Sequence, residues 1–131
     1  MATYLHPDIF DNGLTELSSG TGMSIVVCDG APTTRDEASN LLSGDGFRVS
    51  DEITLDAEDV TLESITDGRQ AAIAEQTGNV EEDSTDSPEL WVAIYDDSRL
   101  LVVTDETSDQ SLTAGNPLTI PAFNVSITTN V

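Results

Sequence analysis

The segment Leu90–Thr104, with the sequence LWVAIYDDSRLLVVT, decides the fold class of this chain. Two apolar runs, Leu90–Tyr95 and Leu100–Thr104, flank the polar tetrapeptide Asp96–Arg99. Short runs rich in valine, isoleucine and aromatic residues, joined by a polar turn, are typical of a β-hairpin. We therefore expect two antiparallel strands in this segment.

Further segments with β character lie on both sides of the hairpin. Met23–Cys28 is a continuous apolar run with β-branched residues at its centre, which predicts a strand buried on both faces. Shorter strands are expected at Phe47–Val49 and Arg69–Ala74. The segment Leu118–Ile127 alternates between apolar and polar residues except at Pro121–Ala122, which suits a bulge or an edge strand.

Helical and irregular segments complete the predicted layout. Pro7–Leu17 has a proline suited to a first helical position and apolar residues at helical spacing, and Thr34–Leu42 begins with a capping box. Asp51–Thr66 is expected to form a partly exposed strand pair or a long loop, and Glu81–Pro88 a solvated loop. With about seven short strands, the chain is predicted to be an all-β sandwich or barrel with one or two short N-terminal helices.

The charge balance is the second informative feature. Among 131 residues there are 25 acidic and four basic ones, for a formal net charge of −21. The basic residues are all arginines: Arg35, Arg48, Arg69 and Arg99. In dilute buffer this charge pushes the compact state apart, whereas molar salt shortens the screening length to about 3 Å. The sequence therefore predicts a protein that works in concentrated brine; the alternative is an ordinary acidic protein, although such proteins usually keep several lysines.

Length and composition limit the class of protein. We expect one domain spanning residues 1–131, with a helical or anchor segment at 1–20. The negative charge argues against binding to nucleic acid or to an anionic membrane. No apolar stretch approaches the ~20 residues of a membrane span, and the N-terminus lacks the pattern of a cleaved leader. We therefore expect a soluble protein that binds neither nucleic acid nor membrane.

The residue patterns that usually mark an enzyme are missing. His6 is the only histidine, and the single Cys28 ends an apolar strand, where a buried and inert thiol is expected. These two residues cannot form a tetrahedral zinc site within one chain. Acidic pairs such as Asp96–Asp97 are expected by chance and do not follow calcium-loop spacing, although a loosely held cation stays an alternative. The scattered arginines are expected to pair with neighbouring acids. The sequence thus predicts no enzyme, cofactor or metal site.

Several short motifs occur in a fixed order along the chain. They are Tyr4-Leu5-His6 with Asp11–Leu14, Cys28–Thr34, Gly68-Arg69, Trp91–Leu101, Ser111–Asn116 and Ile120–Phe123. In this order they resemble small virion proteins encoded among the head genes of tailed phages, over nearly the whole chain and least from Asp51 to Thr66. The resemblance implies a structural component of a virion. Combined with the predicted salt adaptation, it implies a tailed virus of a haloarchaeon.

Within a virion, the expected role is that of a decoration or cementing protein at the capsid surface, with the major capsid protein as partner. Tyr4, Leu5, Ile9 and Phe10 form an apolar cluster near the chain start and are the expected interface; the alternative is that they cap the β core. Self-association, in the form of a trimer, follows by analogy. The alternatives are a connector, collar or tail component and, from another class, a displayed host-binding or glycan-binding module, for which 5% aromatic residues is poor material.

Overall fold

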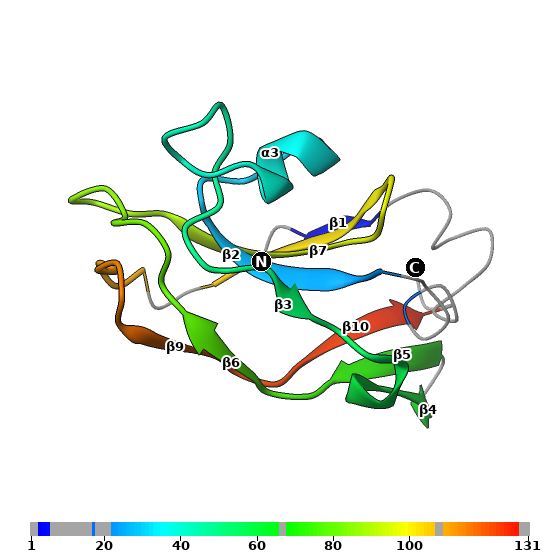
Figure 1. Ribbon diagram of the computed structural model, residues 1–131. Coiled ribbons are helices and arrows are strands. Elements are labelled where there is room, and N and C mark those ends of the chain that lie inside the picture. The colour runs from blue at the N-terminus through cyan, green and yellow to red at the C-terminus, as the bar shows by residue number, and fades with distance from the viewer. Residues whose placement is uncertain (1–2, 6–16, 18–21, 66–67, 107–108, 129–131) are drawn as a thin grey trace.

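The computed structural model describes residues 3–5, 17, 22–65, 68–106 and 109–128. Antiparallel strands dominate this part of the chain, so the all-β prediction is confirmed (Figure 1). The strands are β1 (Thr3–Leu5), β2 (Ser24–Asp29), β3 (Ile53–Thr54), β4 (Val60–Ile65), β5 (Gly68–Ile73), β6 (Gln76–Asn79), β7 (Leu90–Tyr95), β8 (Leu100–Asp105), β9 (Pro117–Ile120) and β10 (Phe123–Thr128). The helical elements are α3 (Arg35–Ser39) and the 3-10 turn η1 (Ala57–Asp59).

The first sheet contains five strands in the order β1-β8-β7-β2-β3. The hairpin predicted from Leu90–Thr104 is confirmed as β7 and β8. In the turn between β7 and β8, Asp96 Oδ1 accepts hydrogen bonds from the backbone N–H groups of Ser98 and Arg99 at 2.9 and 2.7 Å. A short carboxylate that binds the backbone two and three residues ahead stabilises a tight turn. Asp96 therefore fixes the connection between the two strands.

A β-bulge in β8 changes which side chains face the core. The register between β7 and β8 shifts by one residue at Leu101. Leu101 and Val102 consequently both belong to the cluster between the two β layers, whereas Leu100 and Val103 belong to the cluster on the opposite face. All four side chains are buried. One inserted residue thus lets a run of four apolar residues fill both faces of the sheet.

The second β layer is a long ribbon with a kink near its middle. β5 pairs with β10 and β6 pairs with β9 in one continuous register, because no residue is inserted between the pairs Ile73↔Phe123 and Gln76↔Ile120. Pairing lapses at Pro121–Ala122, where proline offers no N–H. The predicted interruption is therefore confirmed, but as a kink and not as a bulge. β4 pairs with the other edge of β5.

The main hydrophobic core lies between the two β layers. Its buried members come from both, and include Ile25, Val27, Ile94, Leu101, Ala71, Ile73, Ile120 and Val125. A second cluster on the outer face of the first sheet contains Val26, Cys28, Ala93 and Tyr95, with Ala38 of α3 and Phe47 packed on it. Strand β2 is accordingly buried on both faces, as its continuous apolar run predicted.

The strand predicted at Phe47–Val49 is wrong, because this segment forms only isolated bridges. The chain here passes from the first sheet to β6. The backbone N–H of Val49 donates to the Val27 carbonyl at 3.0 Å, and that of Asp51 donates to the Asn79 carbonyl at 3.0 Å. A segment that crosses between layers pairs only briefly with each of them. This crossing closes one side of the sandwich.

Helix α3 is shorter than predicted and ends at Ser39. Its N-cap is Thr34, whose hydroxyl accepts a hydrogen bond from the Glu37 N–H at 3.1 Å, in agreement with the predicted helix start. The helix predicted over Pro7–Leu17 lies outside the described residues apart from Leu17, which is fully buried in the main core. No helix in the described part of the chain is long and apolar enough to cross a membrane.

The remaining strands differ from expectation in their number. Asp51–Thr66 contains the strands β3 and β4 with η1 between them, but not the predicted strand pair, because β3 pairs with β2 and β4 pairs with β5. Strand β6 has the polar sequence QTGN and was missed, because its pairing with β9 outweighs its weak β propensity. Strand β1 was also missed, because the chain start was assigned to an anchor segment. The described residues therefore contain more strands than the seven or so predicted.

Candidate interaction surfaces

Several carboxylates bind backbone N–H groups and hold loops in place. Asp29 accepts from the N–H groups of Thr85 and Glu89 at 2.8 and 3.1 Å, which ties the acidic loop to the end of β2. Asp109 accepts from the N–H of Leu90 at 2.9 Å. Within the described ranges, no three His, Cys, Asp or Glu side chains converge on a possible metal position. These acids therefore act as loop anchors.

The arginines with described side chains are held within the fold. Arg48 pairs with Glu81 at 2.7 Å and Arg99 pairs with Asp96 at 2.6 Å, as predicted for neighbouring acids. Arg35 differs, because its Nε donates to the backbone carbonyl of Asp96 at 2.6 Å. Burial opposes ionisation of Asp96, but hydrogen bonds from Arg99 and from the turn backbone outweigh it and lower the pKa of this carboxyl group. This arrangement stabilises the β7-β8 turn.

Tyr95 connects the outer cluster to the surface. Its side chain is buried, and its hydroxyl donates a hydrogen bond to the carboxylate of Glu52. The guanidinium of Arg35 lies 4.9 Å from the centroid of the tyrosine ring, within cation–π range. Burial, followed by the interaction with Glu52, raises the pKa of Tyr95 far above its ordinary value. The hydroxyl therefore stays protonated and serves the fold.

Cys28 is fully buried beneath α3, with its Sγ 3.9 Å from the Ala38 carbonyl. Burial raises the pKa of this thiol from 9.0 to about 12. We expect the folded protein in molar salt at pH 8 to resist a thiol reagent such as DTNB, and the denatured protein to react at once. Burial raises the pKa of the folded-state thiol, so the neutral Cys28 contributes fully to the free energy of unfolding below pH 9.0. This contribution is lost as the pH rises towards 12. Rapid labelling of the folded protein would contradict the burial of Cys28.

The predicted interface residues fall in two groups. Tyr4 and Leu5 lie in β1, where they pair with Val103 and Val102 of β8, so that β1 forms one edge of the first sheet. Ile9 and Phe10 lie outside the described residues. The backbone of the chain start is thus part of the sheet. A contact between these four residues and a partner stays a prediction.

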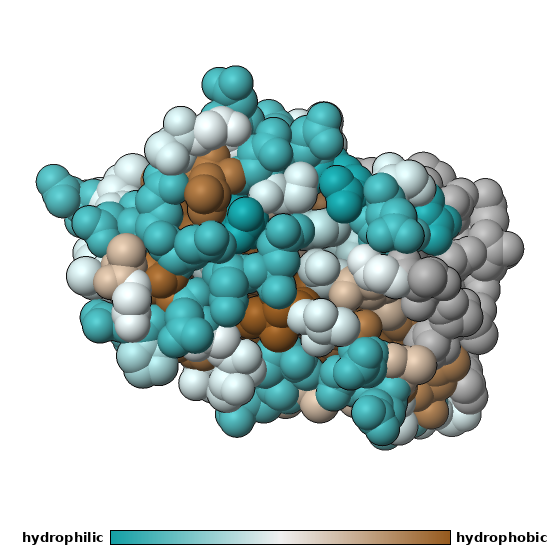
Figure 2. All heavy atoms as spheres, in the orientation of Figure 1, coloured by the Kyte–Doolittle hydropathy of each residue, from teal (hydrophilic) through white to brown (hydrophobic). Residues whose placement is uncertain are grey.

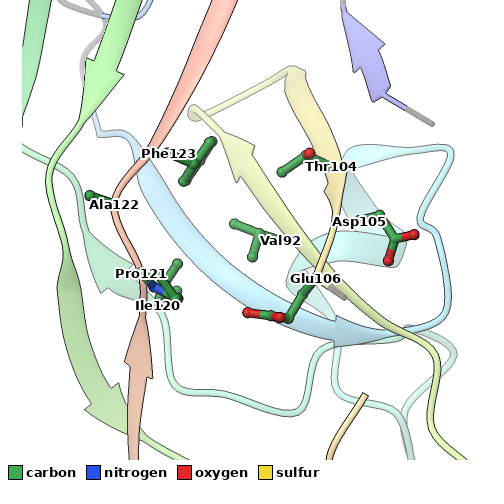
Figure 3. Close-up of a pocket in the computed structure, with 8 residues that line it drawn as sticks. All are labelled: Val92, Thr104, Asp105, Glu106, Ile120, Pro121, Ala122 and Phe123. Carbon is green, nitrogen blue, oxygen red and sulfur yellow. The ribbon is translucent and has the colours of Figure 1, made fainter. Parts of the chain in front are cut away.

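A surface hollow that the sequence did not predict runs along β9 and the kink that follows it. Two adjoining cavities of about 130 and 370 Å³ share Glu106 and Pro121 as lining residues. We call this hollow the β9 groove; one wall is the segment Pro117–Phe123, and the other wall contains residues of β7 and β8. Figure 3 shows the lining of the smaller cavity, with Ile120–Phe123 on one side and Val92, Thr104 and Glu106 on the other.

The β9 groove has an apolar lining and an acidic rim. Leu112, Leu118 and Phe123 are partly exposed along it. Figure 3 shows the carboxylate of Glu106 directed towards the wall formed by β9 and the kink, and that of Asp105 directed away from it. The paired prolines of the sequence PLTIP were the available signal, because prolines within a β-type segment mark an edge strand.

Comparison with known proteins identifies no relative, since no family model, curated protein or solved structure matches this chain. The structure shows what the ordered sequence motifs do locally. Cys28–Thr34 joins β2 to the N-cap of α3, Trp91–Leu101 contains the β7-β8 turn, Ser111–Asn116 leads into β9, and Ile120–Phe123 forms the kink.

Proposed function

We propose that the protein is a non-enzymatic structural component of a tailed-virus particle, bound to the outside of the capsid shell in concentrated salt. The observation that carries this proposal is the ordered series of motifs that resembles small head proteins of tailed phages. Most of these motifs coincide with strand ends, a helix cap, turns and the kink of the second layer. The features in common are thus those that build a scaffold, as a shell component requires.

The surface chemistry supports a role in brine. Figure 2 shows one face of the molecule, on which hydrophilic side chains predominate and apolar atoms form small patches between them. Four arginines cannot neutralise 25 acidic residues, so most carboxylates face water or salt cations. A densely packed shell surface that carries such residues would stay hydrated and would repel neighbouring particles.

The proposed partner is the major capsid protein, and the proposed anchor is the N-terminal segment that contains Tyr4, Leu5, Ile9 and Phe10. Strand β1 lies at a sheet edge, where a chain end can contact a neighbour without disturbing the core. In molar salt, apolar and backbone contacts outlast surface ion pairs. Copies of the protein are proposed to associate as trimers at local threefold positions of the shell.

Copy number in the virion tests this proposal directly. We expect quantitative mass spectrometry of gradient-purified particles, kept in high salt, to find this protein in numbers comparable to those of the major capsid protein. The capsid protein in the same digest serves as the internal standard. About a dozen copies or fewer would place the protein in a connector, collar or tail, where ring symmetry limits the count. Absence from purified particles would overturn the virion role altogether.

A further inference from the structure

We propose that the β9 groove binds an extended segment of another protein, one that alternates apolar with other residues and carries arginine or lysine. The segment would add to the outer edge of β9 as a further antiparallel or parallel strand, with its apolar side chains in the groove. This mode of binding combines main-chain hydrogen bonds with side-chain pockets. The inference concerns a site and a ligand chemistry, and it does not depend on the virion role.

The hydrogen-bond pattern of the ribbon shows which backbone groups of β9 point outward. In an antiparallel pair, hydrogen-bonded and non-hydrogen-bonded positions alternate along each strand. The N–H of Val80 donates to the Asn116 carbonyl at 2.8 Å, in register with the pairing of β6 and β9. The next position, Asn79, instead exchanges hydrogen bonds with Asp51 on the other side of β6. The alternation is thus established from both sides of β6.

Continuing this alternation along β9 assigns its outward groups. Leu118 and Ile120 occupy hydrogen-bonded positions opposite β6, whereas Pro117 and Thr119 occupy the positions between them. Their backbone groups therefore point away from β6, and Pro117 sits where its missing N–H costs nothing. The N–H and C=O of Thr119 and the C=O of Pro117 are thus presented at the outer edge. Among the described strands, only β6 pairs with β9.

The groove beside this edge matches the side chains of an added strand. Side chains of neighbouring strands at paired positions point to the same face of a sheet. Leu118 and Ile120 point inward, so every second residue of an added strand would also point inward, over the cavity of about 370 Å³. Leu90 and Leu112 line that cavity. Apolar residues at alternate positions of the ligand would therefore be buried there.

The charge around the groove favours a basic segment of another protein over a second copy of this chain. Glu106 lines both cavities, and Asp105 lines the smaller one. This chain has no lysine, and Arg35, Arg48 and Arg99 are engaged within the fold, so a second copy has little cationic charge to place beside Glu106. A cationic side chain beside Glu106 in a partly enclosed groove is screened less by salt than an exposed pair. The occupant is therefore a heterologous, cationic strand.

The test uses the full chain in molar KCl and a synthetic peptide of about six residues, the usual length of a strand. Of its three inward-facing alternate positions, two carry valine and one carries arginine, and threonine stands between them. Binding is measured by fluorescence anisotropy of the labelled peptide and by amide exchange of the protein. We expect saturable binding that slows exchange of the Thr119 N–H. The same peptide with glutamate in place of arginine should bind at least about tenfold more weakly.

Two substitutions at one position separate the docking edge from the fold. Thr119→Pro removes the outward N–H and leaves the β6 ladder intact, so it should weaken binding at least about tenfold. Thr119→Ala keeps the N–H and should bind like the unmodified chain, and Glu106→Gln should reduce the preference for arginine. Equal binding by Thr119→Pro, or no slowing of exchange at Thr119 in the unmodified chain, would overturn the proposal. Self-association that Thr119→Pro abolishes would assign the edge to a second copy instead.

Discussion

Dialysis of the protein to below about 0.5 M salt is expected to expand or unfold it, because the screening length then grows towards the spacing between surface charges. The net charge of −21 is carried by a chain whose arginines are few, and Arg35, Arg48 and Arg99 are already engaged within the fold. Added salt is therefore the main source of screening. Circular dichroism and sedimentation across a salt series measure the transition, and labelling of Cys28 reports loss of the core.

A charge-reduced variant tests the cause of this transition. Glu75, Asp86 and Glu89 are exposed, and none of their side chains accepts a hydrogen bond from another described residue. The triple variant Glu75→Gln, Asp86→Asn, Glu89→Gln should stay folded at a lower salt concentration. The matched control, Glu75→Asp, Asp86→Glu, Glu89→Asp, changes shape and keeps charge, so its transition should not move. Native circular dichroism of the unmodified protein in millimolar salt would refute the adaptation to brine.

The parts of the fold that sequence patterns predicted are those with strong local signals. Strands β2, β7 and β8 consist mainly of apolar residues, many of them β-branched or aromatic. Such residues favour a buried strand whichever neighbour they pack against. The bulge at Leu101 was not predictable, because four consecutive apolar residues fit either face of a sheet. The error at Phe47–Val49 has a similar origin: three residues cannot show whether a segment continues in a sheet or crosses to another layer.

The candidate sites were less predictable than the fold. The β9 groove exists because the kink at Pro121–Ala122 and the end of β8 meet in space, although they are distant in sequence. The prolines indicated an edge, but an edge alone does not show what it faces.

The acidic residues illustrate the same limit. The pair Asp96–Asp97 is expected by chance in a chain this acidic, yet the Asp96 carboxylate fixes the β7-β8 turn. Asp29 and Asp109, which no sequence pattern singled out, hold the acidic loop and the start of β7.

Replacement of Arg48 by methionine is expected to cost about 2–4 kcal/mol of the free energy of unfolding, because it leaves two backbone carbonyl groups without their donor. Arg48 is 8% exposed and connects three parts of the chain. Its Nε donates to the Ser39 carbonyl at the end of α3 at 2.8 Å, and its Nη1 donates to the Ser50 carbonyl and to Glu81 Oε2, both at 2.7 Å. Methionine preserves the apolar stem and leaves these acceptors without their donor.

Arg99→Met is the comparison variant, because it removes the same charge from an arginine whose own side chain is more exposed than that of Arg48. The Arg99 side chain is 26% exposed and that of Arg48 is 9% exposed. The partner Asp96 is buried but keeps its two backbone hydrogen bonds, so Arg99→Met should cost less, about 1–2 kcal/mol. Urea unfolding in molar KCl compares the two variants at equal net charge. If Arg48→Met exposes Cys28 to thiol reagents before the global transition, α3 detaches first. If both variants lose the same free energy of unfolding, apolar contacts with Ala38 and Phe47 hold α3 on the sheet, and Arg48 does not.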